Sequence, residues 1–352
     1  MKNLFAVLSF CLCAMGCSSA EVPERVILDT DMGNDSDDAL ALLMFYKYAD
    51  EGKGKLECIA INKDNPQACV ATDIIAQYYG RGDIPICRVE PSAGVSKNNG
   101  WFLKELVDAK KSDGSLLFKR KITEKTPIPE AVKYLRQVLA KAPDKSISYV
   151  SIGFLTNIAN LLKSPADDIS PLDGKALFEK KVKVLSLMGA EFLPLGNPDP
   201  KKCNPEFNVS SDIESSKYVF KHCPVDIVFS GIEVGASILY PHKMALERFG
   251  EENNPVMLAY EVVAINGRKQ NPKNLTLPTY DLTSVLYVFE PELFKLSERG
   301  TVSIYNEKGV AQFTKDPNGK HRYMIADTPA MKKKILDRLG ELTDVKPKQN
   351  VK

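Results

Sequence analysis

Five carboxylates stand within ten residues near the start of the chain: Asp29, Asp31, Asp35, Asp37 and Asp38. An apolar run at residues 25–28 precedes them, and a helix-like run at 39–48 follows. Parallel α/β enzymes keep their chemistry at such a place, where a strand ends and a helix begins. Carboxylates this dense repel one another unless a cation holds them, and oxygen ligands favour Ca²⁺ or Mg²⁺ over zinc. The segment therefore predicts a metal site.

Other Asp-rich motifs do not fit this spacing. An EF-hand loop needs Gly at its sixth position and Glu at its twelfth, but a start at Asp29 puts Asn34 and Leu40 there. An aspartyl-phosphate phosphatase would use Asp29 as nucleophile and Asp31 as acid, and its other motifs are missing from the sequence. A solvated acidic turn at a helix N-terminus gains about 0.3–1 kcal/mol per carboxylate, which explains one or two of the five.

A metal site at the end of a strand gives each carboxylate a different task. Asp31, just past the strand, can contact both the metal and a water molecule. Asp38 can bind the metal with both oxygens. Asp37 points elsewhere along the predicted helix and can accept a hydrogen bond from a substrate hydroxyl.

The 352-residue chain has the composition of a soluble globular protein, 44% hydrophobic and 26% charged. Its net charge is +2, with Lys and Arg spread along the chain, so nothing favours a nucleic-acid partner. Five cysteines follow residue 20, and none forms a C-x-x-C pair, so no zinc or redox site is expected. Their odd number leaves at least one thiol free.

Residues 1–20 are predicted to be an export signal. The apolar run 4–15 is too short to span a membrane but fits the core of a signal peptide. The run 14–17, Ala-Met-Gly-Cys, resembles a bacterial lipobox in which Cys17 would be lipidated, and cleavage near Ala20 is the alternative. We therefore expect an exported protein, periplasmic or anchored through Cys17 to a membrane of a bacterial envelope.

Past the signal, β-like runs alternate with helix-like runs. This pattern predicts an α/β fold with a mostly parallel sheet and flanking helices, a Rossmann-like core. The predicted strands are residues 25–30, 56–62, 84–88, 146–152, 183–188 and 225–230. The predicted helices are residues 37–49, 69–79, 129–142, 155–163 and 211–220. Residues 301–305 and 310–314 flank a hairpin-like turn, and the absence of a Pro- or Ser-rich linker predicts a single domain over 23–345.

Two stretches, 91–125 and 241–280, are predicted to be irregular. They carry four aromatic residues, Trp101, Phe102, Tyr260 and Tyr280. Long loops in a compact α/β enzyme often close over substrate, although they can also be surface decoration.

Several motifs, in order, resemble those of the inosine–uridine nucleoside hydrolase family. The acidic segment and the Ala-Leu-Ala-Leu that follows it match the family signature, and further blocks match at 152–159, 187–189, 196–214 and 280–294. The resemblance covers roughly residues 25–310. It implies the nucleoside hydrolase fold and hydrolysis of the N-glycosidic bond of a ribonucleoside or related ribosyl compound.

The resemblance also implies residue roles. Calcium would be held by Asp31, Asp38, Asp281 and the main-chain carbonyl of Ile152. Asp31 would also act as general base for the attacking water. Contacts to the ribose would come from four polar side chains, with Asn65 as a weaker match: Asp37, Asn197, Glu206 and Asn208. These oxygens would also stabilise positive charge on the sugar in the transition state.

The chain departs from the family pattern at three places, which leave the ribose and metal half of the site intact but make the half that faces the leaving base unusual. The Asp pair lies two residues further from Gly33 than in the family pattern, so Asp35 is extra. Tyr280 stands where many members have a histidine that protonates the base, and Ala190 replaces the second glycine of a Met-Gly-Gly turn. The chain's histidines lie outside every motif and are predicted to be surface residues: His222, His242 and His321.

Base departure can then follow three routes. Tyr280 would donate its phenolic proton, which needs a lowered pKa or a concerted transfer. Stacking on Trp101 or Tyr280 would instead ease protonation from solvent, or the protein would bind a ribosyl compound without cleaving it. We expect calcium-dependent hydrolysis. A nucleoside- or ribose-binding lipoprotein without activity is the alternative, and a structural calcium protein is a third. Relatives are commonly oligomeric, which leaves a homo-oligomer open.

Overall fold

The computed structural model describes residues 22–91, 100–271 and 275–348. The predicted export signal and Cys17 lie outside these residues, as does part of the first irregular stretch. Within the described ranges, every helix is too short or too polar to cross a membrane.

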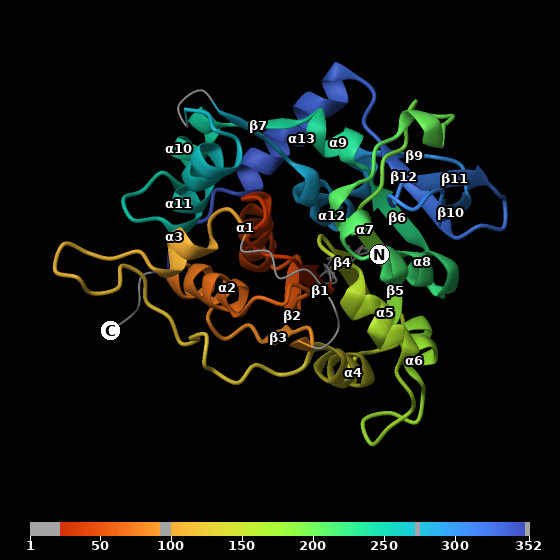
Figure 1. Ribbon diagram of the computed structural model, residues 1–352, viewed down its shortest axis with the longest axis horizontal. Helices are drawn as coiled ribbons and strands as arrows, with labels where there is room; N and C mark the ends of the chain where they lie inside the picture. The colour runs from red at the N-terminus through yellow and green to blue at the C-terminus, as the bar shows by residue number, and fades with distance from the viewer. Residues whose placement is uncertain (1–21, 92–99, 272–274, 349–352) are drawn as a thin grey trace, which may run out of the picture.

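A ten-stranded, mostly parallel sheet forms the centre of the described chain (Figure 1). Seven strands lie side by side in parallel, in the order β3 (Ile86–Arg88), β2 (Gly54–Ile61), β1 (Glu24–Thr30), β4 (Ile147–Ser151), β5 (Val182–Met188), β6 (Ile227–Ser230) and β12 (His321–Ile325). The chain reverses its direction of winding between β1 and β4. In open α/β sheets, this switch point leaves a crevice outside the carboxyl ends of the two strands.

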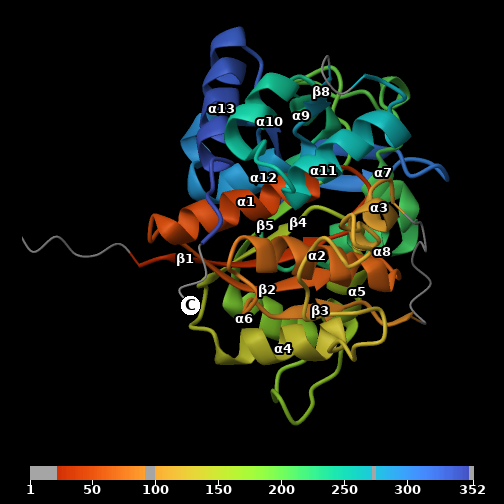
Figure 2. The ribbon, with the colours of Figure 1, turned by 90° about the vertical axis from the view of Figure 1, so that its left-hand side faces the viewer.

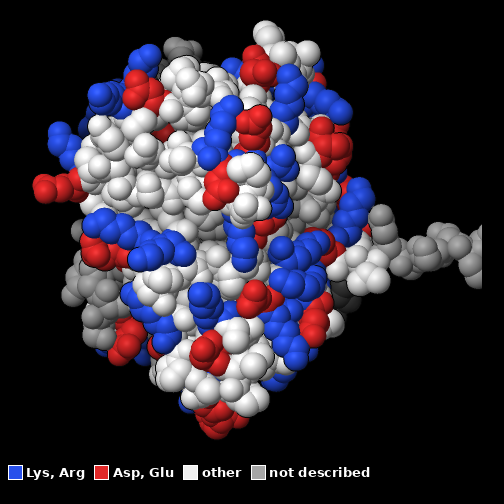
Figure 3. Space-filling view, turned by 90° about the vertical axis from the view of Figure 1, so that its right-hand side faces the viewer, with Lys and Arg blue, Asp and Glu red and all other residues white. Residues whose placement is uncertain are grey.

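Antiparallel strands extend the sheet beyond β12: β9 (Lys295–Leu296), β10 (Gly300–Ile304) and β11 (Ala311–Lys315). The pairing of β10 with β11 confirms the predicted hairpin. Basic and acidic side chains are intermixed on the face of the molecule that Figure 3 shows. Two ion pairs lie next to the antiparallel strands, Arg299 with Asp226 and Lys315 with Glu298. A separate ribbon pairs β7 (Leu239–Pro241) with β8 (Thr276–Pro278).

Helices cover both faces of the sheet (Figure 2). One layer contains α1 (Asp37–Asp50), α2 (Pro66–Tyr78), α10 (His242–Phe249), α11 (Pro255–Val262), α12 (Tyr280–Phe289) and α13 (Pro329–Leu342). The opposite layer contains α4 (Ala131–Lys141), α5 (Thr156–Lys163), α6 (Gly174–Lys181) and α8 (Ile213–His222). Shorter helical segments are α3 (Leu103–Val107), α7 (Phe207–Ser211), α9 (Ile232–Ala236), η2 (Pro200–Lys202), η3 (Val263–Gly267, a π-helical turn) and η5 (Pro291–Leu293). The predicted α/β class is therefore confirmed.

Strand β1 shows how the core holds the acidic segment in place. Val26 and Leu28 belong to the apolar cluster beneath α1 and α12, whereas Ile27 belongs to the cluster beneath α4, α5 and α6. Successive side chains of a strand point to opposite faces, so a strand covered on both sides is apolar throughout. Full burial of each such side chain contributes about 1.5–3 kcal/mol. The carboxylates that follow β1 are thus attached to a strand whose last five residues are fully buried.

The strands and helices predicted from the sequence all form, with ends that differ by up to three residues. The prediction that 241–280 is irregular is wrong, because this stretch contains α10, α11, η3 and β8. Asn254 caps α11 by accepting a 2.9 Å hydrogen bond from the Val256 amide, and Pro255 occupies the first helical position. An Asn-Pro pair favours a helix start, a signal that the interpretation as loop overlooked.

The prediction that the histidines lie at the surface is wrong for two of the three. His242 begins α10 and is buried against Tyr260. His321 begins β12 and is buried in the sheet, where its Nδ1 accepts a 2.7 Å hydrogen bond from the Val302 amide. Both positions are set by packing of distant elements, which a local motif does not report. His222, at the end of α8, is partly exposed.

Candidate active site

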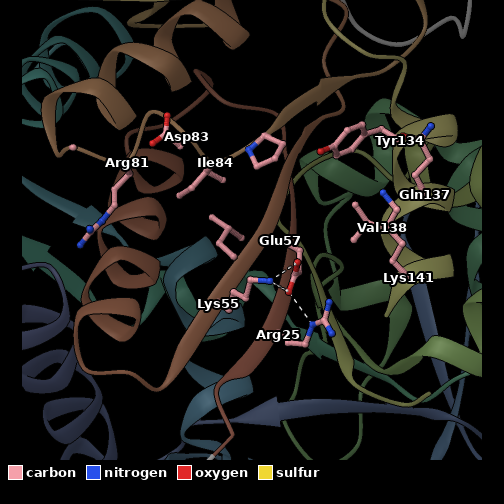
Figure 4. A pocket seen from close by; sticks show the side chains of 13 residues that line it. Arg25, Lys55, Glu57, Arg81, Asp83, Ile84, Tyr134, Gln137, Val138 and Lys141 are labelled. Atoms are coloured by element: carbon pink, nitrogen blue, oxygen red, sulfur yellow. Dashed lines mark hydrogen bonds and ion pairs between the residues drawn. The ribbon is translucent and has the colours of Figure 1, made fainter. Parts of the chain in front are cut away.

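Two cavities lie at opposite ends of the parallel strands. Figure 4 shows the one at the amino ends of β1 and β2, where Arg25 and Lys55 both point to Glu57. Arg25 Nε lies 2.8 Å from Glu57 Oε1, and Lys55 Nζ lies 3.1 Å from Oε2, so one carboxylate holds both cations. None of the site residues predicted from the sequence lines this cavity.

The second cavity, of about 530 Å³, lies at the carboxyl ends of β1, β4 and β5. It brings together segments that are far apart in the chain. Its lining includes every predicted site residue except Asn65 and Asn197: Asp31, Asp37, Asp38, Trp101, Ile152, Glu206, Asn208, Tyr280 and Asp281. Asn65 instead caps α2, where its Oδ1 accepts a 2.9 Å hydrogen bond from the Gln67 amide. Asn197 belongs to a turn in which its amide donates to the Pro194 carbonyl.

Asp29 does not line this cavity but lies on β1, next to the acidic segment that does. Its carboxylate is completely buried and accepts hydrogen bonds from Asn62, Asn157 and Tyr149 at 2.9, 3.0 and 2.7 Å. Burial raises the pKa of Asp29 to about 7, although these donors counteract the rise. Asp29 therefore fixes the end of β1, from which the acidic segment continues.

Three buried carboxylates form a candidate cation site. Oxygens of Asp37, Asp38 and Asp281 lie within 4.8 Å of one another, because α1 and α12 pack together through their first turns. Burial and the neighbouring negative charges raise the pKa of all three, that of Asp37 to about 8. The charge of buried Lys63 opposes the rise in the pKa of Asp38, but this single cation does not balance several carboxylates. The oxygen donors and their uncompensated charge fit Ca²⁺ or Mg²⁺.

This cluster differs in one member from the ligand set implied by the resemblance. Asp37, which was expected to contact the sugar, lies beside Asp281 and accepts a 3.2 Å hydrogen bond from its amide. Asp31 is not one of the three, although its charge helps to raise the pKa of Asp38. Its Oδ2 accepts a hydrogen bond from the side-chain amide of Asn34, and Asn34 Oδ1 in turn accepts one from Lys63 at 2.5 Å. This chain of hydrogen bonds orients the carboxylate of Asp31 at the cavity wall.

A second polar wall comes from α7. Glu206 caps this helix and accepts hydrogen bonds from the amides of Asn208, Val209 and Ala190 at 2.8, 3.0 and 3.3 Å. Burial raises its pKa to about 7. Ala190 reaches Glu206 with a φ of +69°, a left-handed conformation that favours glycine, the residue that the family pattern has there. Glu206 and Asn208 both line the cavity, together with the acidic segment.

The remaining wall carries Tyr280, Trp101, Arg268 and Asp35. Tyr280 is half-buried, and burial raises the pKa of its phenol, so the lowered pKa needed for easy proton donation is absent. Trp101 is 41% exposed, and its amide donates to the Gly33 carbonyl at 2.8 Å. Arg268 was missed by the sequence analysis, although the extra carboxylate of Asp35 was a signal that a cationic partner lies elsewhere in the chain.

The fold and the cavity together define a class: doubly wound α/β proteins with an oxygen-rich cation site at the switch point of the sheet. Within that class, the chain belongs to the inosine-uridine preferring nucleoside hydrolase family, whose model matches residues 26–333. The matched residues thus extend from strand β1 to the first turn of helix α13.

Individual relatives agree with this assignment. Uridine nucleosidase 1 of Arabidopsis thaliana is 26% identical over 228 residues, which are 63% of this chain and 61% of that protein. The match therefore spans less than two thirds of this relative. A plant nucleoside hydrolase superimposes with a TM-score of 0.67 at 21% identity, covering 92% of this chain and 100% of that one. A purine-preferring ribonucleoside hydrolase from Gardnerella vaginalis superimposes with a TM-score of 0.66 at 16% identity, again covering 92% of this chain and 100% of that one. These structures share the fold.

Proposed function

We propose that the chain is an exported, calcium-dependent hydrolase that splits the N-glycosidic bond of a ribonucleoside or related ribosyl compound into ribose and free base. The observation that carries this proposal is the cavity in which Asp31, the cluster Asp37–Asp38–Asp281 and the cap residue Glu206 converge. Family membership supports it, as do relatives named as a uridine nucleosidase and a purine-preferring ribonucleoside hydrolase.

Asp38 and Asp281 are the residues best placed to hold calcium, together with Asp37 from the cluster and with Asp31 and the Ile152 carbonyl from the cavity wall. When bound, a divalent cation lowers the pKa of a water molecule and orients it. Calcium suits this set because it accepts six to eight oxygen ligands, including carbonyls and bidentate carboxylates.

In this proposal, Asp31 is the general base. Its carboxylate, oriented by Asn34 and Lys63, takes a proton as the water oxygen attacks C1′ of the ribose. The C1′–N bond breaks, and its electron pair leaves with the base. Glu206 lines the same cavity, where its negative charge stabilises the positive charge that develops on the ribose ring.

The test is release of reducing sugar from a panel of ribonucleosides by the mature protein in calcium. Asp31→Asn is expected to lower kcat by about 10²–10⁴-fold, the range for loss of a positioned base. Asp226→Asn is the matched control, because this partly exposed carboxylate pairs with Arg299 far from the cavity. A wild-type protein that binds calcium but turns over no ribosyl substrate would refute the proposal.

The second candidate is a nucleoside- or ribose-binding lipoprotein without activity. It is favoured by the residue at the position where a proton donor is expected, which is the half-buried phenol of Tyr280 and not a histidine; burial raises the pKa of this phenol. It predicts heat of nucleoside binding in calorimetry, no product over days, and unchanged affinity in Tyr280→Phe.

The proposed export rests on the first 20 residues and has its own test. Mass spectrometry of the protein from a bacterial envelope is expected to show a mature chain that begins at a diacylated Cys17. Cys17→Ala then moves the protein from the membrane fraction to the soluble fraction. A mature chain that begins near residue 20 without lipid would replace the anchor with ordinary secretion.

A further inference from the structure

Among the described residues that line the acidic cavity, Arg268 is the one with a basic side chain. Six carboxylates share the lining with it: Asp31, Asp35, Asp37, Asp38, Glu206 and Asp281. The mechanism proposed above assigns no task to Arg268 or to Asp35, the residue that is extra relative to the family pattern.

Arg268 and Asp35 form an ion pair across the cavity wall. Arg268 Nη2 lies 2.8 Å from Asp35 Oδ2, and the two side chains are 26% and 15% exposed. This bond occupies one of the five N–H donors of the guanidinium, and the buried Nε has no hydrogen-bond partner among the described residues. The charge of the guanidinium also acts on the phenol of Tyr280, where it opposes the rise in pKa that burial causes. Arg268 therefore stands beside the position where relatives carry the leaving-group histidine.

The backbone around Arg268 is tied to Trp101. The Arg268 amide donates to the Val263 carbonyl at 3.0 Å, which closes the π-helical turn η3. Gly267 packs so closely on the Trp101 ring that a Cβ atom there would lie 2.5 Å from it. The indole and the guanidinium thus belong to one wall of the cavity that Glu206 and Asn208 also line.

The charges around the cavity indicate a role for Arg268. If the base leaves without first gaining a proton, it carries the electron pair of the broken C1′–N bond as negative charge. The six carboxylates disfavour such an anion in the cavity. A guanidinium stays protonated at any working pH and presents several N–H donors in one plane, so it stabilises an anion without having to transfer a proton.

We propose that Arg268, held in place by Asp35, stabilises the departing base as an anion. The proposal rests on the hydrolase function proposed above. Water supplies the new O–C1′ bond and its proton goes to Asp31, while the C1′–N electron pair goes to the base. The guanidinium donates hydrogen bonds to the base anion, which then takes a proton from solvent water. Arg268 is the catalytic residue in this step, and Asp35 is a positioning residue.

A merely structural ion pair predicts a different dependence on the leaving group. Uridine and inosine release bases whose anions need stabilisation, whereas 4-nitrophenyl β-D-ribofuranoside releases an anion that is already stable. Loss of Arg268 should therefore slow the two nucleosides much more than the nitrophenyl riboside. A distorted cavity would slow all three alike.

The experiment measures kcat and KM for the three substrates with the wild type, Arg268→Gln, Arg268→Lys and Asp35→Asn. Arg268→Gln should lower kcat on the nucleosides by about 10²–10³-fold, as for loss of one charge-stabilising donor, and by less than about fivefold on the nitrophenyl riboside. On the nucleosides, the kcat of Arg268→Lys should be higher than that of Arg268→Gln but lower than that of the wild type. The kcat of Asp35→Asn should also lie between those of Arg268→Gln and the wild type. Arg299→Gln, which breaks the surface pair with Asp226, is the matched control.

Equal losses on all three substrates, or none, would overturn the role of Arg268 while leaving the hydrolase function intact. A wild type that cleaves the nitrophenyl riboside but no nucleoside would also overturn it, because no base is then being stabilised. A wild type that cleaves nothing would remove the proposed function and this inference with it.

Discussion

The phenol of Tyr149 donates a 2.7 Å hydrogen bond to Oδ2 of Asp29, and both side chains are completely buried. Tyr149 lies on β4 and Asp29 on β1, the two strands that flank the switch point of the sheet. Asn62, just past β2, and Asn157 on α5 donate to the other oxygen of Asp29. Three neighbouring elements are therefore joined at the residue where the acidic segment begins.

Tyr149→Phe should lower the free energy of unfolding by about 1–3 kcal/mol, because a buried carboxylate loses one of its donors. Urea unfolding followed by circular dichroism measures this change. Tyr305→Phe is the matched control, since Tyr305 is 42% exposed and should change stability by less than about 0.5 kcal/mol. Equal stability of Tyr149→Phe and the wild type would show that the hydrogen bond does not hold the strands together.

Calcium should raise the melting temperature, because the cation relieves repulsion among Asp37, Asp38 and Asp281. At about 100 times its Kd, the ion adds about 2.7 kcal/mol, which corresponds to about 4 °C for a chain of this size. Asp281→Asn should abolish this rise. The same variant should melt at or above the wild type in chelator, since the raised pKa of Asp281 means that its charge destabilises the metal-free fold. A calcium shift that persists in Asp281→Asn would place the site elsewhere.

Gly235→Ala should displace the start of α12. A Cβ atom at Gly235 would lie 2.4 Å from Tyr280 Cα, and the Gly235 carbonyl accepts a hydrogen bond from the Thr279 amide. We expect a loss of about 1–3 kcal/mol of stability from overpacking, and weaker calcium binding because Asp281 follows directly. Differential scanning calorimetry and calcium titration measure the two effects. Ala236→Ser, at an exposed neighbouring position, is the control. Unchanged calcium affinity in Gly235→Ala would contradict this account.

His321 should make the fold sensitive to acid. Burial lowers the pKa of His321 to about 4, from 6.5 for the free side chain. The unfolded chain therefore binds more protons between these values, so stability is full above pH 6.5 and falls as the pH drops towards 4, by about 3 kcal/mol in total. His321→Asn keeps an acceptor for the Val302 amide but does not titrate. The difference in unfolding free energy between the two proteins should shrink as the pH falls through this window. A constant difference from pH 4 to 7 would exclude His321 as the source.

Local patterns in the sequence were sufficient for most of the elements. The alternation of β-like and helix-like runs predicted the strands from β1 to β6 and five of the helices. It failed over 241–280, where the capping signal at Asn254 was outweighed by the mixed composition of the stretch. The spacing of carboxylates also predicted a metal site, and the structure brings Asp37, Asp38 and Asp281 together there.

The sequence by itself determined the residue types of the site and their attachment to a buried strand, because an apolar run before an acidic turn is a local property. Only the tertiary structure decided which side chains meet. Asp281 lies 244 residues from Asp37, and Arg268 lies 233 residues from Asp35. These distant partners are set by the packing of α1, η3 and α12 over the sheet, since burial of apolar faces brings segments together without regard to their separation in the chain. The five carboxylates of the acidic segment could be identified from ten residues of sequence, whereas their cationic partner Arg268 could not.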